Sequence, residues 1–212
     1  GAEAVTMVLY ASDGMAQKNA GMNMSEAEDV TVDILRQANQ EGIQVIATIA
    51  VAFECPFDGP TDPTFVQRAV CKFLQSEVSQ VVLADTIGAA DPQQVRDLTS
   101  TLIKSHGGER LGCHFHDTRA MGLANVYAAL ESGIRHFDSS IGGLGGCPFA
   151  PGASGNVATE DVVMMLEQMG FDTGIDLPLL LEASDLAQSL TGAVSGGKSK
   201  VWLQTHLQKQ AL

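Results

Sequence analysis

Residues 80–118, QVVLADTIGAADPQQVRDLTSTLIKSHGGERLGCHFHDT, predict a strand, a helix and a second strand in succession. The apolar run Val81–Ala84 has the length of a buried strand. Asp91 and Pro92 then mark a helix start, because aspartate caps free backbone N–H groups and proline suits the first helical position. Residues 110–115, RLGCHF, form the next strand. Two strands joined in this way over about 30 residues are typical of a βαβ unit with parallel strands.

The same alternation continues in both directions from this unit. Further strands are predicted at residues 5–10, 43–51 and 134–139. Further helices are predicted at residues 25–41, 63–76, 122–132, 159–169 and 177–190, the first opened by a capping box of Ser25 and Glu28. Five strands that alternate with helices favour a parallel sheet covered by helices. No linker divides the chain, so we expect residues 1–212 to belong to one domain.

Composition and charge exclude several classes of function. Of the 212 residues, 45% are hydrophobic and 17% are charged, which is enough apolar surface for a buried core. The net charge is −13, so we expect neither a nucleic-acid partner nor an anionic membrane surface. No apolar run approaches the 18 or so residues of a membrane span, and we expect no signal peptide. The first residue is glycine and not methionine, so we expect the true N-terminus to lie upstream.

The cysteines indicate an intracellular protein. Cys55, Cys71, Cys113 and Cys147 form no CxxC pair, and a chain of this size needs no disulfide framework. We therefore expect reduced thiols. The cytoplasm of a bacterium and the mitochondrial matrix both remain open as compartments.

The strongest chemical signal is the pair His114 and His116 at the end of one predicted strand. Residues two apart on a strand point to the same face, so the two imidazoles can reach one metal ion. The alternative is a pair of buried histidines with ordinary hydrogen-bond partners. The spacing and the strand-end position, where ligands bind in parallel α/β folds, favour metal ligation.

A second signal is the glycine-rich segment GGLGGCPFAPGASGN, residues 142–156. So many glycines permit unusual backbone angles and a mobile lid. Cys147, near its centre, can act as a proton donor or acceptor if its pKa lies near the working pH. The alternative is a flexible loop with an incidental thiol.

Two acids have both a chemical and a structural interpretation. Asp85 ends its strand, where it either presents its carboxylate to a site or caps the next turn. Glu160 lies in the first turn of a predicted helix, where the helix dipole already favours an acid.

Together these motifs resemble the 3-hydroxy-3-methylglutaryl-CoA lyase family. The stretch DSSIGGLGGCPFAPGASGNVATEDVVMMLEQMG, residues 138–170, is similar to the signature loop of that family and the helix after it. HFHDT (114–118) resembles its metal-binding strand, LADTIG (83–88) the preceding strand, and ECPFDGP (54–60) the loop before that. The resemblance covers nearly the whole chain.

This resemblance implies a fold, a reaction and a set of site residues. The fold is a TIM-type (β/α)8 barrel with a divalent cation, Mg²⁺ or Mn²⁺, at its C-terminal face. The reaction is cleavage of 3-hydroxy-3-methylglutaryl-CoA to acetyl-CoA and acetoacetate, so the binding partner is an acyl-CoA thioester. The resemblance is also compatible with a homodimer. The implied metal ligands are His114, His116 and Asn156, and the implied catalytic residues are Cys147, Asp85 and Glu160.

The chain departs from the family pattern at its start. The first family strand carries an Arg–Asp motif, which is absent here, so by order of motifs the chain begins at about the fourth strand. We therefore expect a barrel that lacks its first three βα units and that is inactive by itself. The alternatives are an acyl-transferring synthase of the same metal-dependent group, or an inactive truncated barrel that serves as an interaction module.

Overall fold

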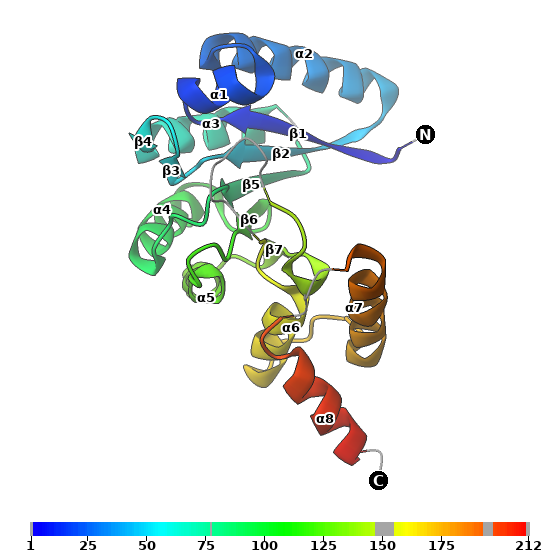
Figure 1. The fold of residues 1–212 in the computed structure, drawn as a ribbon. Coiled ribbons are helices and arrows are strands. Elements are labelled where there is room, and N and C mark those ends of the chain that lie inside the picture. The colour runs from blue at the N-terminus through cyan, green and yellow to red at the C-terminus, as the bar shows by residue number, and fades with distance from the viewer. Residues whose placement is uncertain (1, 77, 147–154, 193–196, 211–212) are drawn as a thin grey trace.

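The computed structural model describes residues 2–76, 78–146, 155–192 and 197–210. Its centre is a five-stranded sheet in the order β1-β2-β5-β6-β7, in which every neighbouring pair is parallel (Figure 1). A small antiparallel hairpin, β3 and β4, follows the second of these strands. The strands are β1 (Ala4–Tyr10), β2 (Gln44–Ala50), β3 (Glu54–Cys55), β4 (Gly59–Pro60), β5 (Gln80–Asp85), β6 (Leu111–Phe115) and β7 (His136–Asp138).

Helices connect the parallel strands, and the last helix, α8, extends away from the sheet (Figure 1). The described part of the chain holds no helix with the length and apolar character to cross a membrane. The helices are α1 (Asp13–Ala20), α2 (Met24–Glu41), α3 (Pro63–Gln75), α4 (Pro92–His106), α5 (Gly122–Ser132), the short 3-10 helix η1 (Ile141–Gly143), α6 (Thr159–Gln168), α7 (Leu177–Thr191) and α8 (Lys200–Gln210). The predicted α/β class and the five parallel strands are therefore confirmed.

The N-terminal region differs from the prediction in two places. Helix α1 was not predicted; Ser12 caps its start, and Gly21 ends it with a φ of 69°. The capping box of α2 is formed by Asn23 and Glu26, and the predicted pair of Ser25 and Glu28 is wrong. The Asn23 side chain accepts from the Glu26 N–H at 3.0 Å, and Glu26 accepts from the Asn23 N–H at 2.8 Å. Asparagine is as good a cap as serine, so both starts were compatible with the sequence.

The strand register separates the residues of the sheet into two faces. Leu9, Ile49, Leu83 and Cys113 are aligned across four strands and are buried in the core on the helix side. Because side chains alternate along a strand, their neighbours point to the other face. There the register aligns Tyr10 with Ala50, and Ala84 with His114 and Asp138. The β2–β5 register ends at Ile49 and Leu83, and continuing it by one residue places Ala50 beside Ala84. We call this set the inner row, since in a barrel this face lines the interior.

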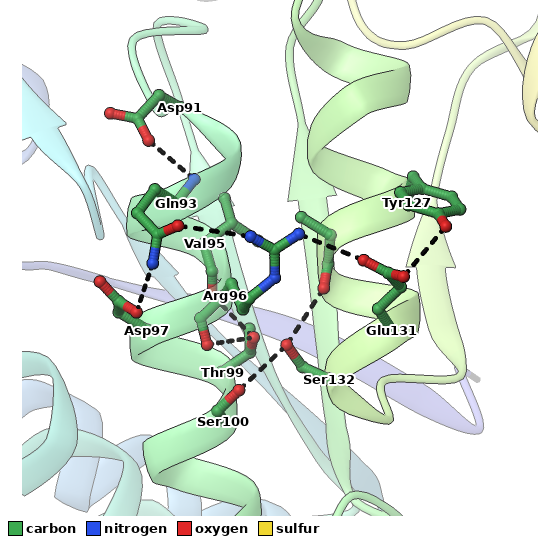
Figure 2. A network of polar contacts seen from close by, with 11 residues as sticks. Asp91, Gln93, Val95, Arg96, Asp97, Thr99, Ser100, Tyr127, Glu131 and Ser132 are labelled. Atoms are coloured by element: carbon green, nitrogen blue, oxygen red, sulfur yellow. Dashed lines mark hydrogen bonds and ion pairs between the residues drawn. The ribbon is translucent and has the colours of Figure 1, made fainter.

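Helices α4 and α5 are also joined by polar contacts on their outer surface, as Figure 2 shows. Arg96 forms an ion pair with Glu131 at 3.1 Å, and Glu131 also accepts from the Tyr127 hydroxyl at 3.0 Å. Both charged side chains are close to half exposed, so this pair contributes at most about 1 kcal/mol. Buried apolar side chains of the two helices, such as Val95 and Val126, therefore contribute more to stability than this ion pair.

The sheet predicts how the isolated 212-residue chain behaves. Its edge strands β1 and β7 each have one side without a strand partner among the described residues, and Val8 on the inner face of β1 is 43% exposed. Open parallel edges and uncovered apolar surface promote association. We expect the chain alone to self-associate and to melt without a single cooperative transition, as measured by light scattering and calorimetry. A monodisperse sample with one sharp transition would contradict this expectation.

Candidate functional site

His114 of β6 and His116, one residue beyond the end of that strand, lie side by side with ring centroids 5.2 Å apart. His116 is 5% exposed, and its Nδ1 atom is buried without a hydrogen-bond partner in the described structure. Burial, reinforced by the neighbouring His114, lowers the pKa of His116 to about 4, so its ring is neutral at pH 7. A neutral imidazole with an unpaired, buried nitrogen is the form of histidine that binds a metal ion.

Asp138 is the neighbour of His114 in the inner row, and sequence reasoning missed it. Its Oδ2 atom lies 3.6 Å from Nδ1 of His114, just beyond hydrogen-bond distance. A carboxylate in this position can hold the ring in the orientation that leaves Nε2 for a metal ion. The sequence offered one signal for Asp138: it lies at the end of the predicted strand that follows the strand with the two histidines.

Asn156 is brought to the histidines by the backbone. It forms an isolated antiparallel bridge with His116, although 40 positions separate the two in the sequence. Its side-chain amide donates to the Leu144 carbonyl at 2.8 Å, which leaves Oδ1 as the acceptor atom. Gly145 has a φ of 103°, and a Cβ at that position would lie 2.8 Å from the Asn156 amide nitrogen, so both the backbone and the close approach favour glycine.

These residues fit a divalent cation as a partial ligand set. The described residues contain no group of three or more His, Cys, Asp or Glu side chains arranged around one point. His114 and His116 supply two nitrogen donors and Asn156 one oxygen donor. An open set of this kind leaves further positions for water or substrate oxygens. The unpaired Nδ1 of His116 is the observation that favours a ligand there.

Glu160 is fully buried in the first turn of α6 and contacts the start of the glycine-rich segment. Its two carboxylate oxygens accept from the N–H of Gly142 at 2.9 and 3.1 Å. Gly142 has a φ of 64°, which most other residues adopt only with strain. This contact fixes the base of the segment that carries Cys147. Cys147 itself lies outside the described residues, as does the whole of 147–154.

Asp85 is turned away from the histidines. Its strand neighbour Ala84 belongs to the inner row, so Asp85 points to the opposite face, where it is 1% exposed. Its oxygens accept from the N–H groups of Ala89 at 2.8 Å and Ala90 at 3.2 Å, as expected of a side chain that caps the next turn. Burial raises the pKa of Asp85 to about 6, although these two N–H groups lower it. A role of Asp85 at the substrate stays a prediction.

A hollow of about 360 Å³ lies over the inner row. Its lining includes both histidines and residues from all five parallel strands. A second hollow, of about 550 Å³, lies beside Trp202 of α8 and holds none of the expected metal ligands. The first hollow is therefore the candidate active site. It is lined by Thr6, Val8, Tyr10, Met15, Asn19, Thr48, Ala50, Ala84, Thr86, His114, His116 and Asp138.

Comparison with known proteins agrees with this fold. Residues 1–187 match the family described as HMGL-like, and the chain belongs to that family. It is 38% identical over 177 residues to hydroxymethylglutaryl-CoA lyase of Pseudomonas mevalonii, covering 84% of this chain and 59% of the relative. It is equally identical over 188 residues to (R)-citramalyl-CoA lyase of Chloroflexus aurantiacus, covering 89% of this chain and 60% of the relative.

A solved structure supports the same conclusion about the fold. The HMG-CoA lyase of Acinetobacter baumannii, in complex with coenzyme A and 3-methylmalate, superposes with a TM-score of 0.88 at 40% identity. The match covers 93% of this chain and 64% of that one. The chain thus has the TIM-type fold of its relatives and spans about three fifths of their length.

The buried carboxyl of Asp85 predicts a pH dependence of stability. Its folded pKa, about 6, lies above the usual aspartate pKa of 3.8, so the unfolded state ionises first as the pH rises. The penalty on the folded state therefore grows between about pH 4 and pH 6 and is fully present above pH 6. Relative to Asp85→Asn, the metal-free full-length protein should lose about 2 kcal/mol of unfolding free energy from pH 4 to pH 7, as measured in urea.

Asp62→Asn is a matched control with the opposite sign. Hydrogen bonds from Thr64 lower the pKa of Asp62, so its stabilisation is present at neutral pH and is lost in acid. Relative to Asp62→Asn, the wild type should not become less stable as the pH rises. If the difference from Asp85→Asn is constant from pH 4 to pH 7, the carboxyl of Asp85 is not perturbed as described.

Proposed function

We propose that the complete protein is a divalent-metal-dependent carbon–carbon lyase that cleaves 3-hydroxy-3-methylglutaryl-CoA to acetyl-CoA and acetoacetate. The observation that carries this proposal is the same-face pair His114 and His116, bridged to Asn156 at the C-terminal edge of a parallel sheet. In barrels of this type, that edge is where catalytic residues gather. Membership of the HMGL-like family supports the reaction class.

His114, His116 and Asn156 are the residues proposed to hold the cation, either Mg²⁺ or Mn²⁺. When bound, the cation supplies positive charge that stabilises the oxygen developing at the hydroxyl-bearing carbon. Asp138 positions the ring of His114, and Glu160 holds the glycine-rich segment through Gly142. The neutral ligand side chains leave the ion's charge largely uncompensated, which suits an anionic substrate.

Cys147 is proposed to exchange a proton with the acetyl-CoA carbon. Cleavage breaks the bond between that carbon and the hydroxyl-bearing carbon, whose hydroxyl proton passes to a base. The electron pair of the broken bond forms the acetyl-CoA enolate, which must then take up a proton. A thiol on a glycine-rich segment close to the substrate is suited to this step. Asp85, the last residue of β5, is proposed to act through the loop that follows, which its hydrogen bonds fix.

A second candidate substrate is citramalyl-CoA, because a lyase for it is as similar to the chain as the hydroxymethylglutaryl-CoA lyase. The two thioesters differ in carbon skeleton, so the shape of the acyl pocket decides between them. Comparing kcat/KM for both with the full-length protein identifies the substrate. Absence of cleavage of both thioesters, with Mg²⁺ and with Mn²⁺, would falsify the proposed reaction.

We further propose that residues 1–212 form the C-terminal part of one barrel domain and that preceding strands complete it. The open edges of β1 and β7 are the positions where such strands would pair. A homodimer and an intracellular location, bacterial cytoplasm or mitochondrial matrix, are part of this proposal.

Removing a proposed ligand should remove the cation. In the full-length protein, His116→Ala should abolish thioester cleavage and lower Mn²⁺ binding at least about tenfold, measured by calorimetry. The expected reason is the loss of a buried nitrogen donor that no other described group replaces. His106→Ala, at the exposed end of α4, should leave both quantities unchanged. Unchanged Mn²⁺ affinity in both His114→Ala and His116→Ala would place the metal elsewhere.

Changing Cys147 should affect turnover and spare the metal. Cys147→Ser should lower kcat about 100- to 10,000-fold, the usual worth of general acid–base catalysis. Mn²⁺ affinity should stay at the wild-type value, since the thiol is not a proposed ligand. Cys71→Ser, on helix α3 outside the sheet, is the matched control and should remain active. If Cys147→Ser has near-normal turnover, or loses its metal, the proposed acid–base role of Cys147 is wrong. The glycine-rich segment would then serve only as a lid.

A further inference from the structure

Arg119 lies in the loop between β6 and α5, and its guanidinium bonds to the loop after β5. Nε donates to the Gly88 carbonyl at 2.8 Å, and Nη2 donates to the Ala89 carbonyl. These carbonyls belong to the same two peptide groups as the N–H groups of Ala89 and Ala90. Asp85 accepts from both of those N–H groups. Two successive peptide groups therefore connect the carboxylate of Asp85 to the guanidinium of Arg119.

This arrangement orients both peptide groups between opposite charges. Each N–H points to the carboxylate and each C=O to the guanidinium, so every hydrogen bond strengthens the one beyond it. Burial is the main cause that raises the pKa of Asp85, and Glu54 of β3 adds to it, whereas the charge of Arg119 lowers it. Arg119 thus stabilises the charged form of a buried carboxylate without touching it. We call Asp85, residues 88–90 and Arg119 the clamp.

The loop held by the clamp rests on His116. Gly88 has a φ of 66°, and a Cβ there would lie 3.1 Å from the His116 carbonyl oxygen and 2.9 Å from the Cβ of Thr118. On the other side, two backbone hydrogen bonds of 3.0 Å join residues 115–117 to residues 155–157. The backbone of His116 is therefore held between two segments, and the clamp fixes one of them.

We infer that Arg119 is a positioning residue for the proposed reaction, which holds the loop after β5 against His116 through the peptide groups of residues 88–90. The inference rests on the proposed function. Arg119 lies outside the described lining of the hollow, so it acts through the loop and not by contact with substrate. Thr86, which begins this loop, does line the hollow. A displacement of about 1 Å in such a support can cost about 100-fold in rate.

Arg119→Met in the full-length protein tests this role, since it keeps a long side chain and removes every donor. Mn²⁺ affinity, measured by calorimetry, and kcat for thioester cleavage should each fall about tenfold, as when the support behind a metal ligand is lost. KM should change less than kcat, because Arg119 does not touch the substrate. Arg119→Lys should lie between the wild type and Arg119→Met, because an ammonium keeps the charge but lacks the planar fork.

Arg96→Met is the matched control. Arg96 pairs with Glu131 on the outer surface of α4 and α5, far from the loop after β5 in sequence and on another face (Figure 2). It should bind Mn²⁺ and cleave the thioester as the wild type does.

A second measurement tests the clamp without any activity. In the metal-free full-length protein at about pH 7, Asp85 is charged, so Arg119→Met should shift the urea midpoint more in the wild type than in the Asp85→Asn background. At about pH 4 the folded protein holds Asp85 protonated, and the shift should be equal in both backgrounds. Glu54 is present in all four proteins, so its effect cancels at each pH.

The outcomes separate this inference from the proposed function. If Arg119→Met binds Mn²⁺ and turns over as the wild type does, Arg119 is a structural link alone and the inference is wrong, while the lyase stands. If the wild type cleaves no tested thioester but Arg119→Met binds Mn²⁺ about tenfold more weakly, the proposed reaction is wrong and the positioning of His116 stands. Equal urea shifts in both backgrounds at pH 7 would overturn the clamp. If Arg119→Met does not fold, Arg119→Lys decides: weakened Mn²⁺ binding supports the inference, and wild-type affinity overturns it.

Discussion

The site depends on one constraint, the parallel register of five strands with strictly alternating side chains. The register fixes which residue of each strand stands beside His114, and alternation decides which of them face the hollow. A shift of one residue in β6 would bury both histidines among the helices and turn Phe115 inward. The large buried side chains on the helix side, such as Phe115 and Leu83, prevent that shift, because exposing them costs about 2 kcal/mol each. The hydrophobic core therefore sets the position of the polar site.

The loops after the strands are fixed by buried carboxylates that bond to backbone N–H groups. Asp85 holds Ala89 and Ala90 after β5, and Glu160 holds Gly142 after β7. A buried carboxylate is costly unless it is satisfied by hydrogen bonds, so each acid strongly favours one loop conformation. In both places the acid lies on an element that is well packed, and the loop is the part being ordered. This arrangement brings the polar ends of neighbouring strands to one edge.

The sequence predicted the elements better than it predicted the directions of side chains. Apolar runs and helix caps located the five strands and the longer helices, since these signals are local. Helix α1 is short, and its start at Ser12 follows β1 directly, so no amphipathic period separated it from a turn. The pair His114 and His116 was found because its spacing is itself a strand signal. Asp85 pointed the other way, and Asp138 was missed, because the register between distant strands cannot be read from the sequence of any one strand.

The rim of the site also stores backbone strain that only the folded structure reveals. Val51, directly after β2, has a φ of 50°, in a region that costs a β-branched residue about 1–2 kcal/mol. Two threonines hold it: its N–H donates to Thr86 at 2.8 Å, and its carbonyl accepts from Thr61 at 2.6 Å. Thr86 lines the hollow, so the strained residue ties the end of β2 to the wall next to the histidines. Strain of this kind persists only where the surroundings over-determine it, and here those surroundings are the loops that shape the hollow. A rigid rim is what a cation site at the end of β6 requires, because its proposed ligands must stay in place while a substrate bond breaks.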